Sequence, residues 1–133
     1  LTAGNGDILA FDARMESQAI EKLIQFDPSH KSELTQRLKR IKDLQEPFIN
    51  RHYIAPGMKS GASLKNALAG LVPDFDYDGE VANGWMASAL YSNLQREEDM
   101  FKRLEGQEAL RAYCHLDTLA MVRILEALEE AVA

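Results

Sequence analysis

The sequence predicts a mostly helical α/β fold with one clear strand signal, and three observations lead to this prediction. The segment GDILAF at residues 6–11 is a short apolar run that follows Gly4 and Asn5, as expected of a buried strand. Most of the remaining chain repeats apolar residues at helical spacing. With 133 residues, of which 46% are apolar and 27% charged, the chain is long enough for one domain and close to the average globular composition.

Two helices are predicted to follow the strand. Apolar residues recur at helical spacing over residues 12–26, and the pair Asp27-Pro28 ends this helix and begins the next one. The second helix is expected over residues 28–44, with an apolar stripe formed by Leu34, Leu38 and Ile41.

Two irregular stretches and three more helices are predicted in the rest of the chain. Residues 46–61 contain two prolines and two glycines, which indicate a loop with a short turn at residues 47–50. Helices are then expected at residues 63–70, about 80–95 and about 106–132, the first two separated by an irregular stretch. The large apolar residues of the 80–95 helix are expected in the core or at helix contacts, namely Trp85, Met86 and Tyr91.

A solitary strand poses a physical problem, because its unpaired backbone donors and acceptors are costly to bury. Three sources could pair with GDILAF: a second copy of the chain, a second strand elsewhere in this sequence, or sequence upstream of Leu1. The strand thus predicts that the domain is incomplete as it stands.

Charge is distributed unevenly along the chain. The net charge of −6 argues against nucleic-acid binding through bulk charge. Residues 30–65 nevertheless carry eight bases against three acids, whereas residues 66–133 carry five bases against thirteen acids. A solvated helix face and a phosphate-contacting surface both explain the basic segment.

The chain is expected to be soluble and cytoplasmic, without a membrane segment. No stretch reaches the roughly 18 consecutive apolar residues that span a bilayer, and no basic segment leads an apolar one at the N-terminus. Cys114, the single cysteine, has no second thiol for an intramolecular disulfide.

Acidic residues fall on the apolar sides of two predicted helices. Asp117 shares a helical face with Tyr113 and Met121, and Glu16 lies on the side that carries Ala19. A buried carboxylate is costly unless it is paired, hydrogen-bonded or bound to a metal. Two alternatives need no metal. Asp117 could lie at the rim of its apolar stripe, near solvent or paired with an arginine. Glu16 could simply provide negative charge in the first turn of its helix.

A shared divalent metal explains Glu16 and Asp117 together, because Mg²⁺ and Mn²⁺ favour oxygen ligands. Two acids are too few for such a site, so further ligands would have to come from elsewhere in the full protein. Asp12 is also explained as the N-cap of the first helix.

At these positions the sequence resembles the DEDD 3′–5′ exonuclease superfamily, whose fold is ribonuclease H-like. ILAFDARMESQAIEKL is similar to its second motif, with Asp12 at the usual Asn position and Glu16 at the acid. AYCHLDTLAMVRIL is similar to the third motif of the tyrosine-bearing subgroup, with Tyr113 and Asp117 matching Tyr-x-x-x-Asp. KDLQEPF and GASLKNALAGLVP resemble the helices between these motifs, so that the resemblance extends over nearly the whole chain. More narrowly, the chain resembles the C-terminal part of an uncharacterised bacterial family, a domain of unknown function related to these nucleases.

The resemblance implies a metal-dependent hydrolysis of nucleic-acid phosphodiesters. By this resemblance, Glu16 and Asp117 bind the metal cofactor, Mg²⁺ or Mn²⁺, and Tyr113 forms a hydrogen bond to the attacking water. The residues expected to contact the substrate are Asp12, Arg51, Lys59 and Lys65. The superfamily's first motif, Asp-x-Glu, and its first strands do not precede GDILAF here, so the chain is expected to be inactive alone. A degenerate fold that binds nucleic acid or protein, and a helical interaction domain, are the competing hypotheses.

Overall fold

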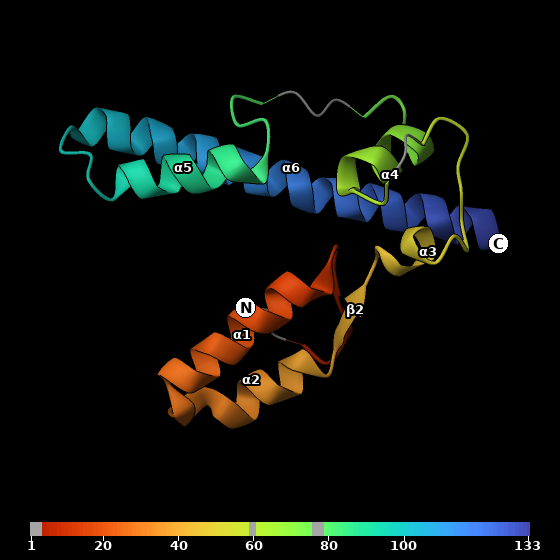
Figure 1. The fold of residues 1–133 in the computed structure, drawn as a ribbon, viewed down its shortest axis with the longest axis horizontal. Helices are drawn as coiled ribbons and strands as arrows, with labels where there is room; N and C mark the ends of the chain where they lie inside the picture. The colour runs from red at the N-terminus through yellow and green to blue at the C-terminus, as the bar shows by residue number, and fades with distance from the viewer. Residues whose placement is uncertain (1–3, 59–60, 76–78) are drawn as a thin grey trace.

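The computed structural model describes residues 4–58, 61–75 and 79–133, and the two parts of its fold are shown in Figure 1. The first part is a small α/β lobe made of β1 (Ile8–Ala10), α1 (Ala13–Phe26), the 3₁₀ turn η1 (Pro28–His30), α2 (Lys31–Leu38) and β2 (Ile41–Asp43). The second part is helical and contains α3 (Glu46–Ile49), α4 (Leu64–Leu71), α5 (Gly84–Leu94) and α6 (Met100–Val132). A mostly helical α/β fold is thereby confirmed.

The partner of the predicted strand is a second strand of the same chain. β1 and β2 pair in parallel, with Ile8 opposite Ile41. The predicted helix over residues 28–44 is therefore wrong in its last part, since α2 ends at Leu38. Arg40 explains the break, because its guanidinium donates to the carbonyls of Gly4 and Gly6 and so ties the end of α2 to the segment before β1.

Both outer edges of the sheet, one on β1 and one on β2, lack a neighbouring strand in the described part of the chain. The amide of Ile8 bonds to Arg40 at 2.9 Å, and the carbonyl of Ala10 accepts from Leu44 at 2.8 Å. Alternate residues of a parallel strand bond to opposite neighbours, so the backbone of Leu9 faces away from β2. Within the described residues the sheet has two strands, and the edge at Leu9 would accept a third.

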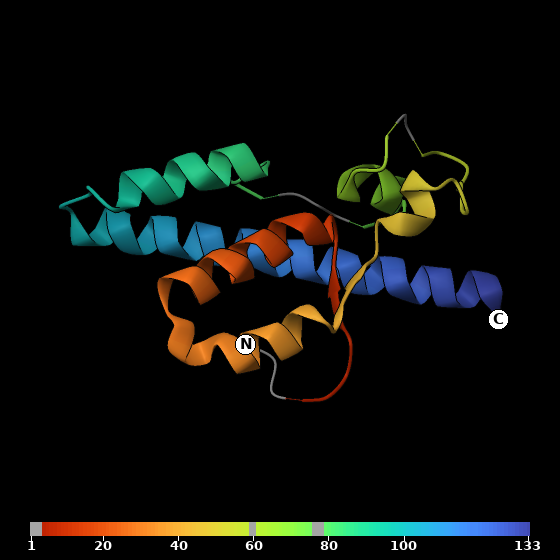
Figure 2. The ribbon, with the colours of Figure 1, turned by 60° about the horizontal axis from the view of Figure 1, so that its bottom comes forward.

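The core forms where α4 packs on the second half of α6, while α5 runs along the first half (Figure 2). The buried cluster consists of Leu44, Phe48, Ala67, Leu68, Ala120 and Ile124. Phe11, which follows β1, stacks on Phe48 with ring centroids 6.2 Å apart. This aromatic pair attaches the end of the sheet to the helical part.

Helix ends in this part follow capping residues. Ser63 accepts a hydrogen bond from Asn66 at 3.3 Å and begins α4 as predicted. Asn83 and Asp99 cap α5 and α6 in the same way, so α5 begins four residues later, and α6 six residues earlier, than predicted. α6 continues through Gly106, and Leu94 of α5 packs closely against it there. A Cβ at residue 106 would lie 2.6 Å from Leu94 Cδ2.

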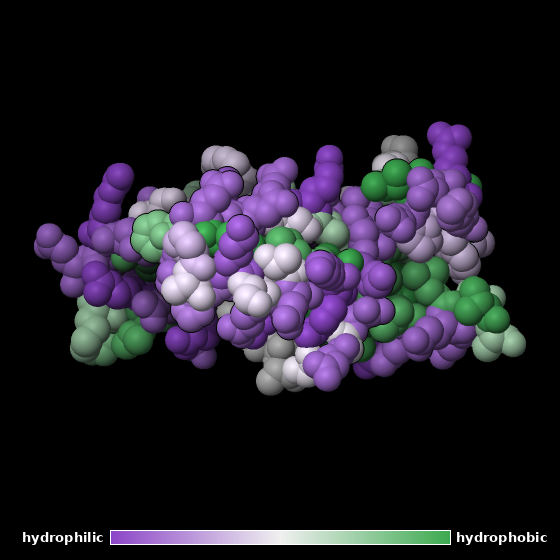
Figure 3. Space-filling view, turned by 90° about the horizontal axis from the view of Figure 1, so that it is seen from below, coloured by the Kyte–Doolittle hydropathy of each residue, from purple (hydrophilic) through white to green (hydrophobic). Residues whose placement is uncertain are grey.

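The chain exposes more surface than a closed domain of its mass. Its accessible area is 9729 Å², whereas a compact 14.9 kDa protein is expected to expose about 7,000 Å². Trp85 is 79% exposed and Tyr91 is also exposed, so neither lies in the core, one of the two places predicted for them. Figure 3 shows a further hydrophobic area at the end of the molecule where α3 and the last turns of α6 lie. No helix among the described residues is long and apolar enough to cross a membrane.

Candidate functional site

Tyr113 and Asp117 lie one turn apart on α6, and both side chains are half-buried. Burial raises the pKa of the Asp117 carboxyl above its ordinary value, and the nearby charge of Lys65 acts in the opposite direction. The ammonium of Lys65, on α4, also donates to the carbonyl of Ala82. α4 and the segment before α5 therefore meet over this part of α6.

The phenol of Tyr113 is held in a partly desolvated position. Burial is the main cause that raises the pKa of Tyr113, followed by the charge of Cys114. The start of α5 lies over the hydroxyl, since a Cβ at Gly84 would be 3.7 Å from it. Tyr113 also lines a hollow of about 510 Å³ that is shared with Glu105 and Glu108. At neutral pH the phenol is a hydrogen-bond donor.

Glu16 lies on the first turn of α1 and is exposed, although it was predicted on a buried side of this helix. α1 has no fully buried residue, but Ile20 and Ile24 of its apolar stripe are half-buried. Glu16 lines a hollow of about 390 Å³ between α1, the sheet and Met121 of α6. Met121 lies one turn beyond Asp117 on α6, whereas Asp117 itself does not line this hollow.

A complete metal site is not formed by the described residues. No three of their His, Cys, Asp and Glu side chains come together in a way that could hold a metal ion. Glu16 and Asp117, the two predicted ligands, are by themselves too few for a whole metal site.

Asp12 occupies the N-cap position of α1 but does not cap it. Its backbone is left-handed, with φ 65°, and its carboxylate accepts two hydrogen bonds from Arg14 at 2.7 and 2.8 Å. The hydrogen bond from Arg14 is the main cause that lowers the pKa of Asp12. The prediction of an Asp12 cap is wrong for this reason, while its role in substrate binding stays a prediction.

Asp43 caps α1 in its place and was not singled out from the sequence. Its two carboxylate oxygens accept from the amides of Asp12 and Ala13, both at 3.1 Å, and Oδ1 also accepts from Gln45 at 2.9 Å. A negative charge suits this position at a helix N-terminus. The available signal was an acid in the KDLQEPF segment, but it lay inside a predicted helix.

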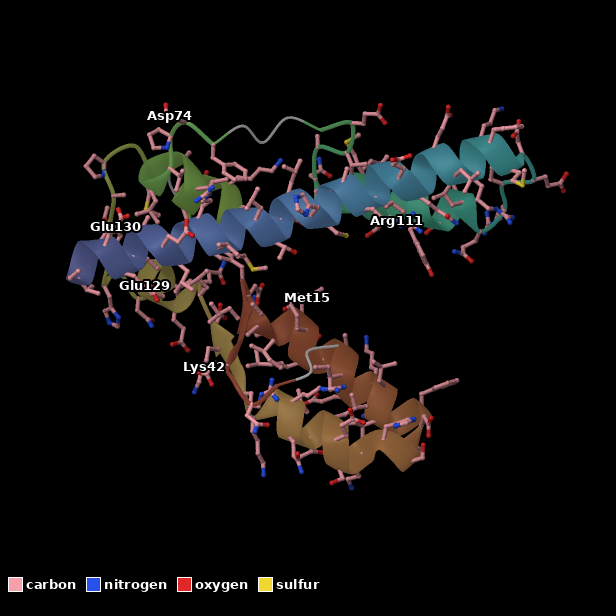
Figure 4. The ribbon with its side chains drawn as sticks, turned by 180° about the vertical axis from the view of Figure 1, so that it is seen from behind. Met15, Lys42, Asp74, Arg111, Glu129 and Glu130 are labelled. Atoms are coloured by element: carbon pink, nitrogen blue, oxygen red, sulfur yellow. The ribbon has the colours of Figure 1, made fainter. Side chains whose placement is uncertain are left out.

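The predicted phosphate contacts lie in different places. Lys65 is near Asp117, whereas Arg51 lines a separate hollow with Tyr53 and Ile54 near α3. Lys59 is outside the described residues. Lys42, another base of this segment, points to the side of the sheet away from α1 (Figure 4). The basic segment of the sequence therefore does not form one surface together with Asp117.

Comparison with known proteins gives one match. No curated protein and no solved structure matches the chain. Residues 2–63 match the family model of a domain of unknown function, DUF2779, and this stretch contains Glu16 but neither Tyr113 nor Asp117. The expected resemblance to a family of unknown function is confirmed, and the relation to nucleases stays a prediction.

Proposed function

We propose that the chain is part of a metal-dependent 3′–5′ exonuclease-like domain that hydrolyses nucleic-acid phosphodiesters, and that it is inactive alone. The observation that carries this proposal is the position of Met121. It lines the same hollow as Glu16 and lies one turn beyond Asp117. The proposal is that Asp117 reaches toward this hollow from α6 and Glu16 from α1, so that the two carboxylates share a metal.

The environment of Asp117 supports a cation-binding role. Its pKa is raised by burial, which means that the ionised form lacks full solvation where it lies. A divalent cation would stabilise this incompletely solvated carboxylate. Carboxyl groups with perturbed pKa values are common in functional sites. In hydrolysis such ions stabilise the attacking and leaving oxygens.

The proposal assigns the remaining ligands to residues outside the described part of the chain. Glu16 and Asp117 are fewer carboxylates than a metal pair needs. Tyr113 would hold a water or a phosphate oxygen by donating a hydrogen bond, because its raised pKa makes it a poor base at neutral pH. Lys65 would provide a positive charge for a phosphate beside Asp117.

A binding module without hydrolysis is the second candidate. The incomplete ligand set among the described residues favours it, because binding of nucleic acid or protein requires no metal. A helical interaction domain is a third candidate that the exposed apolar side chains of α5 favour.

Calorimetric titration with Mn²⁺ tests the ligand assignment. Wild type is compared with a Glu16→Gln, Asp117→Asn double variant and with a Glu21→Gln, Glu130→Gln control on the same two helices. Weak binding that the control keeps and the double variant loses supports the proposal. Equal heats in all three proteins, or none in wild type, contradict it.

A nuclease assay tests the expected inactivity. The purified chain is incubated with single-stranded DNA and Mn²⁺, and no degradation is expected. Degradation that disappears in the Glu16→Gln, Asp117→Asn variant would mean that the chain forms a complete site by itself.

A further inference from the structure

α5 and α6 leave a groove of about 340 Å³ between them, which we call the α5–α6 groove. It is lined by Tyr91, Leu94, Gln95, Arg103, Gln107, Leu110 and Arg111. No acidic side chain lines it, although residues 66–133 carry thirteen acids and only five bases. Two of these five bases, Arg103 and Arg111, line the groove, so the groove is positively charged although this half of the chain is acidic.

The two arginines are spaced along the groove. Arg103 is held in place because its Nη2 donates to the carbonyl of Glu97 at 2.8 Å. Arg111 is exposed and lies on α6 beside α5 (Figure 4). Eight residues separate them, which corresponds to about 12 Å along the helix. This separation suits two phosphates of an extended chain better than one small anion, and guanidinium groups bind phosphate oxygens in pairs.

The other lining residues suit nucleotide bases. The ring of Tyr91 is 60% exposed, which leaves a face available for stacking. Gln95 and Gln107 bring amide donors and acceptors that can bond to base edges, and two leucines supply apolar contact. An acidic peptide would also bond to the arginines and the amides, but it has no planar base to stack on Tyr91, so the lining favours a nucleic acid.

One row of α6 side chains runs from the groove to Asp117, while Arg111 lies to one side of this row. Along α6, the positions 103, 107, 110, 114, 117 and 121 are three or four residues apart, so they lie along one side of the helix. Arg111 precedes Asp117 by about 9 Å along the axis, and Arg103 by about 21 Å. Met121, on the same side of α6, lines the hollow with Glu16.

We infer that the α5–α6 groove binds a single strand of nucleic acid and directs its backbone along α6 toward Asp117. The direction of the strand rests on the proposed function, because only that function gives Asp117 a phosphodiester. Binding in the groove does not depend on a metal. It can therefore be measured separately from hydrolysis.

The test is fluorescence anisotropy with a labelled single-stranded oligonucleotide of twelve nucleotides, as DNA and as RNA, in the presence of a chelator. Arg111→Gln is expected to weaken binding and to reduce the slope of log affinity against log salt by about 0.7, because one phosphate contact is lost. Tyr91→Ala is expected to weaken binding about fivefold to 100-fold with an unchanged slope, because a stacking contact is lost. Arg123→Gln is the matched control, since Arg123 is also an exposed arginine of α6 but bonds to Glu126 and does not line the groove.

Binding of either oligonucleotide with this pattern supports the inference. It is overturned if neither oligonucleotide binds, if Arg123→Gln weakens binding as much as Arg111→Gln, or if a poly-glutamate peptide binds in the groove and the oligonucleotides do not. Circular dichroism establishes that the variants are folded. The Mn²⁺ titration separates the two proposals. If Mn²⁺ binds through Glu16 and Asp117 but the oligonucleotides do not bind, only the groove inference is refuted. If the oligonucleotides bind but Mn²⁺ does not, only the metal site is refuted.

Discussion

The carboxylate of Asp43 accepts a hydrogen bond from the backbone amide of Ala13 at 3.1 Å and so joins the end of β2 to the start of α1. The same carboxylate also accepts from two other amides, those of Asp12 and Gln45. Three backbone donors that would otherwise lack a partner thus depend on one side chain. The short sheet and the first helix are fixed to each other at this point.

Replacing Asp43 by Ala is expected to lower the free energy of unfolding by about 1–2 kcal/mol, the usual cost of losing a helix cap. Urea denaturation followed by circular dichroism measures this value. Lys42→Ala at the neighbouring exposed position is the control and should change stability by less than about 0.5 kcal/mol. Equal losses in both variants would show that the strand, and not the cap, is affected.

Replacing Asp117 by Asn is expected to raise the melting temperature at pH 7. Burial raises the pKa of this carboxyl, so the folded chain holds the proton more tightly than the unfolded chain does. The stabilising contribution of the protonated form is complete below the unfolded pKa of about 3.9 and is lost as pH rises through the folded pKa.

The gain from Asp117→Asn should therefore shrink as the pH is lowered from 7 to 3, as measured by thermal melts across this range. Glu130→Gln, at an exposed position of the same helix, serves as the control and should show no gain at pH 7. A melting temperature that stays unchanged, or falls, at pH 7 in Asp117→Asn would mean that ionised Asp117 is not destabilising.

Replacing Gly70 by Ala is expected to lower stability by about 1 kcal/mol or more. A Cβ at this position of α4 would clash with Met58 Cγ and would lie 3.1 Å from the backbone nitrogen of Met58. Overpacking of this kind costs about 1–3 kcal/mol, more than the 0.5–1 kcal/mol or so that Ala gains over Gly in a helix. Gly84→Ala is the matched control, because its nearest atom, the Tyr113 hydroxyl, is at an ordinary 3.7 Å. If denaturation shows both variants to be stabilised, the packing of α4 on residue 58 is looser than described.

Replacing Ile124 by Ala is expected to cost about 2–5 kcal/mol, because this side chain of α6 has no exposed surface and its removal leaves a cavity. Val122, two residues away and 44% exposed, provides the comparison. Val122→Ala should cost less than about 1 kcal/mol in the same denaturation experiment. Similar costs at the two positions would indicate that α6 does not pack on α4 in solution.

Local signals in the sequence predicted most of the helices. Asp27 followed by Pro28 and Ser63 followed by Leu64 are side-chain caps, and both begin the elements expected of them. The second strand could not be predicted in this way. Ile41 continues the helical spacing of Leu34 and Leu38, and only its pairing with β1, 33 residues earlier, selects the extended conformation.

The sequence predicted the part of the candidate site that lies on one helix, but not the contacts between different helices and strands. Tyr113 and Asp117 are placed together by helical spacing alone, and both are half-buried as their stripe suggested. The exposure of Glu16 depends on what covers α1, and the capping role of Asp43 depends on a strand that local patterns did not reveal. The arginines of the α5–α6 groove likewise become neighbours of Tyr91 only when α5 folds back on α6.

The parallel pairing of β1 with β2 also constrains how the lobe folds. Ile8 can meet Ile41 only after the intervening chain has turned back through α1 and α2, because parallel strands cannot be joined by a tight turn. The loop between them must be closed before any ladder bond forms, and so the sheet cannot nucleate from local contacts. α1 and α2 are therefore expected to form early on the folding pathway, and the hydrogen bonds between β1 and β2 are expected to form late.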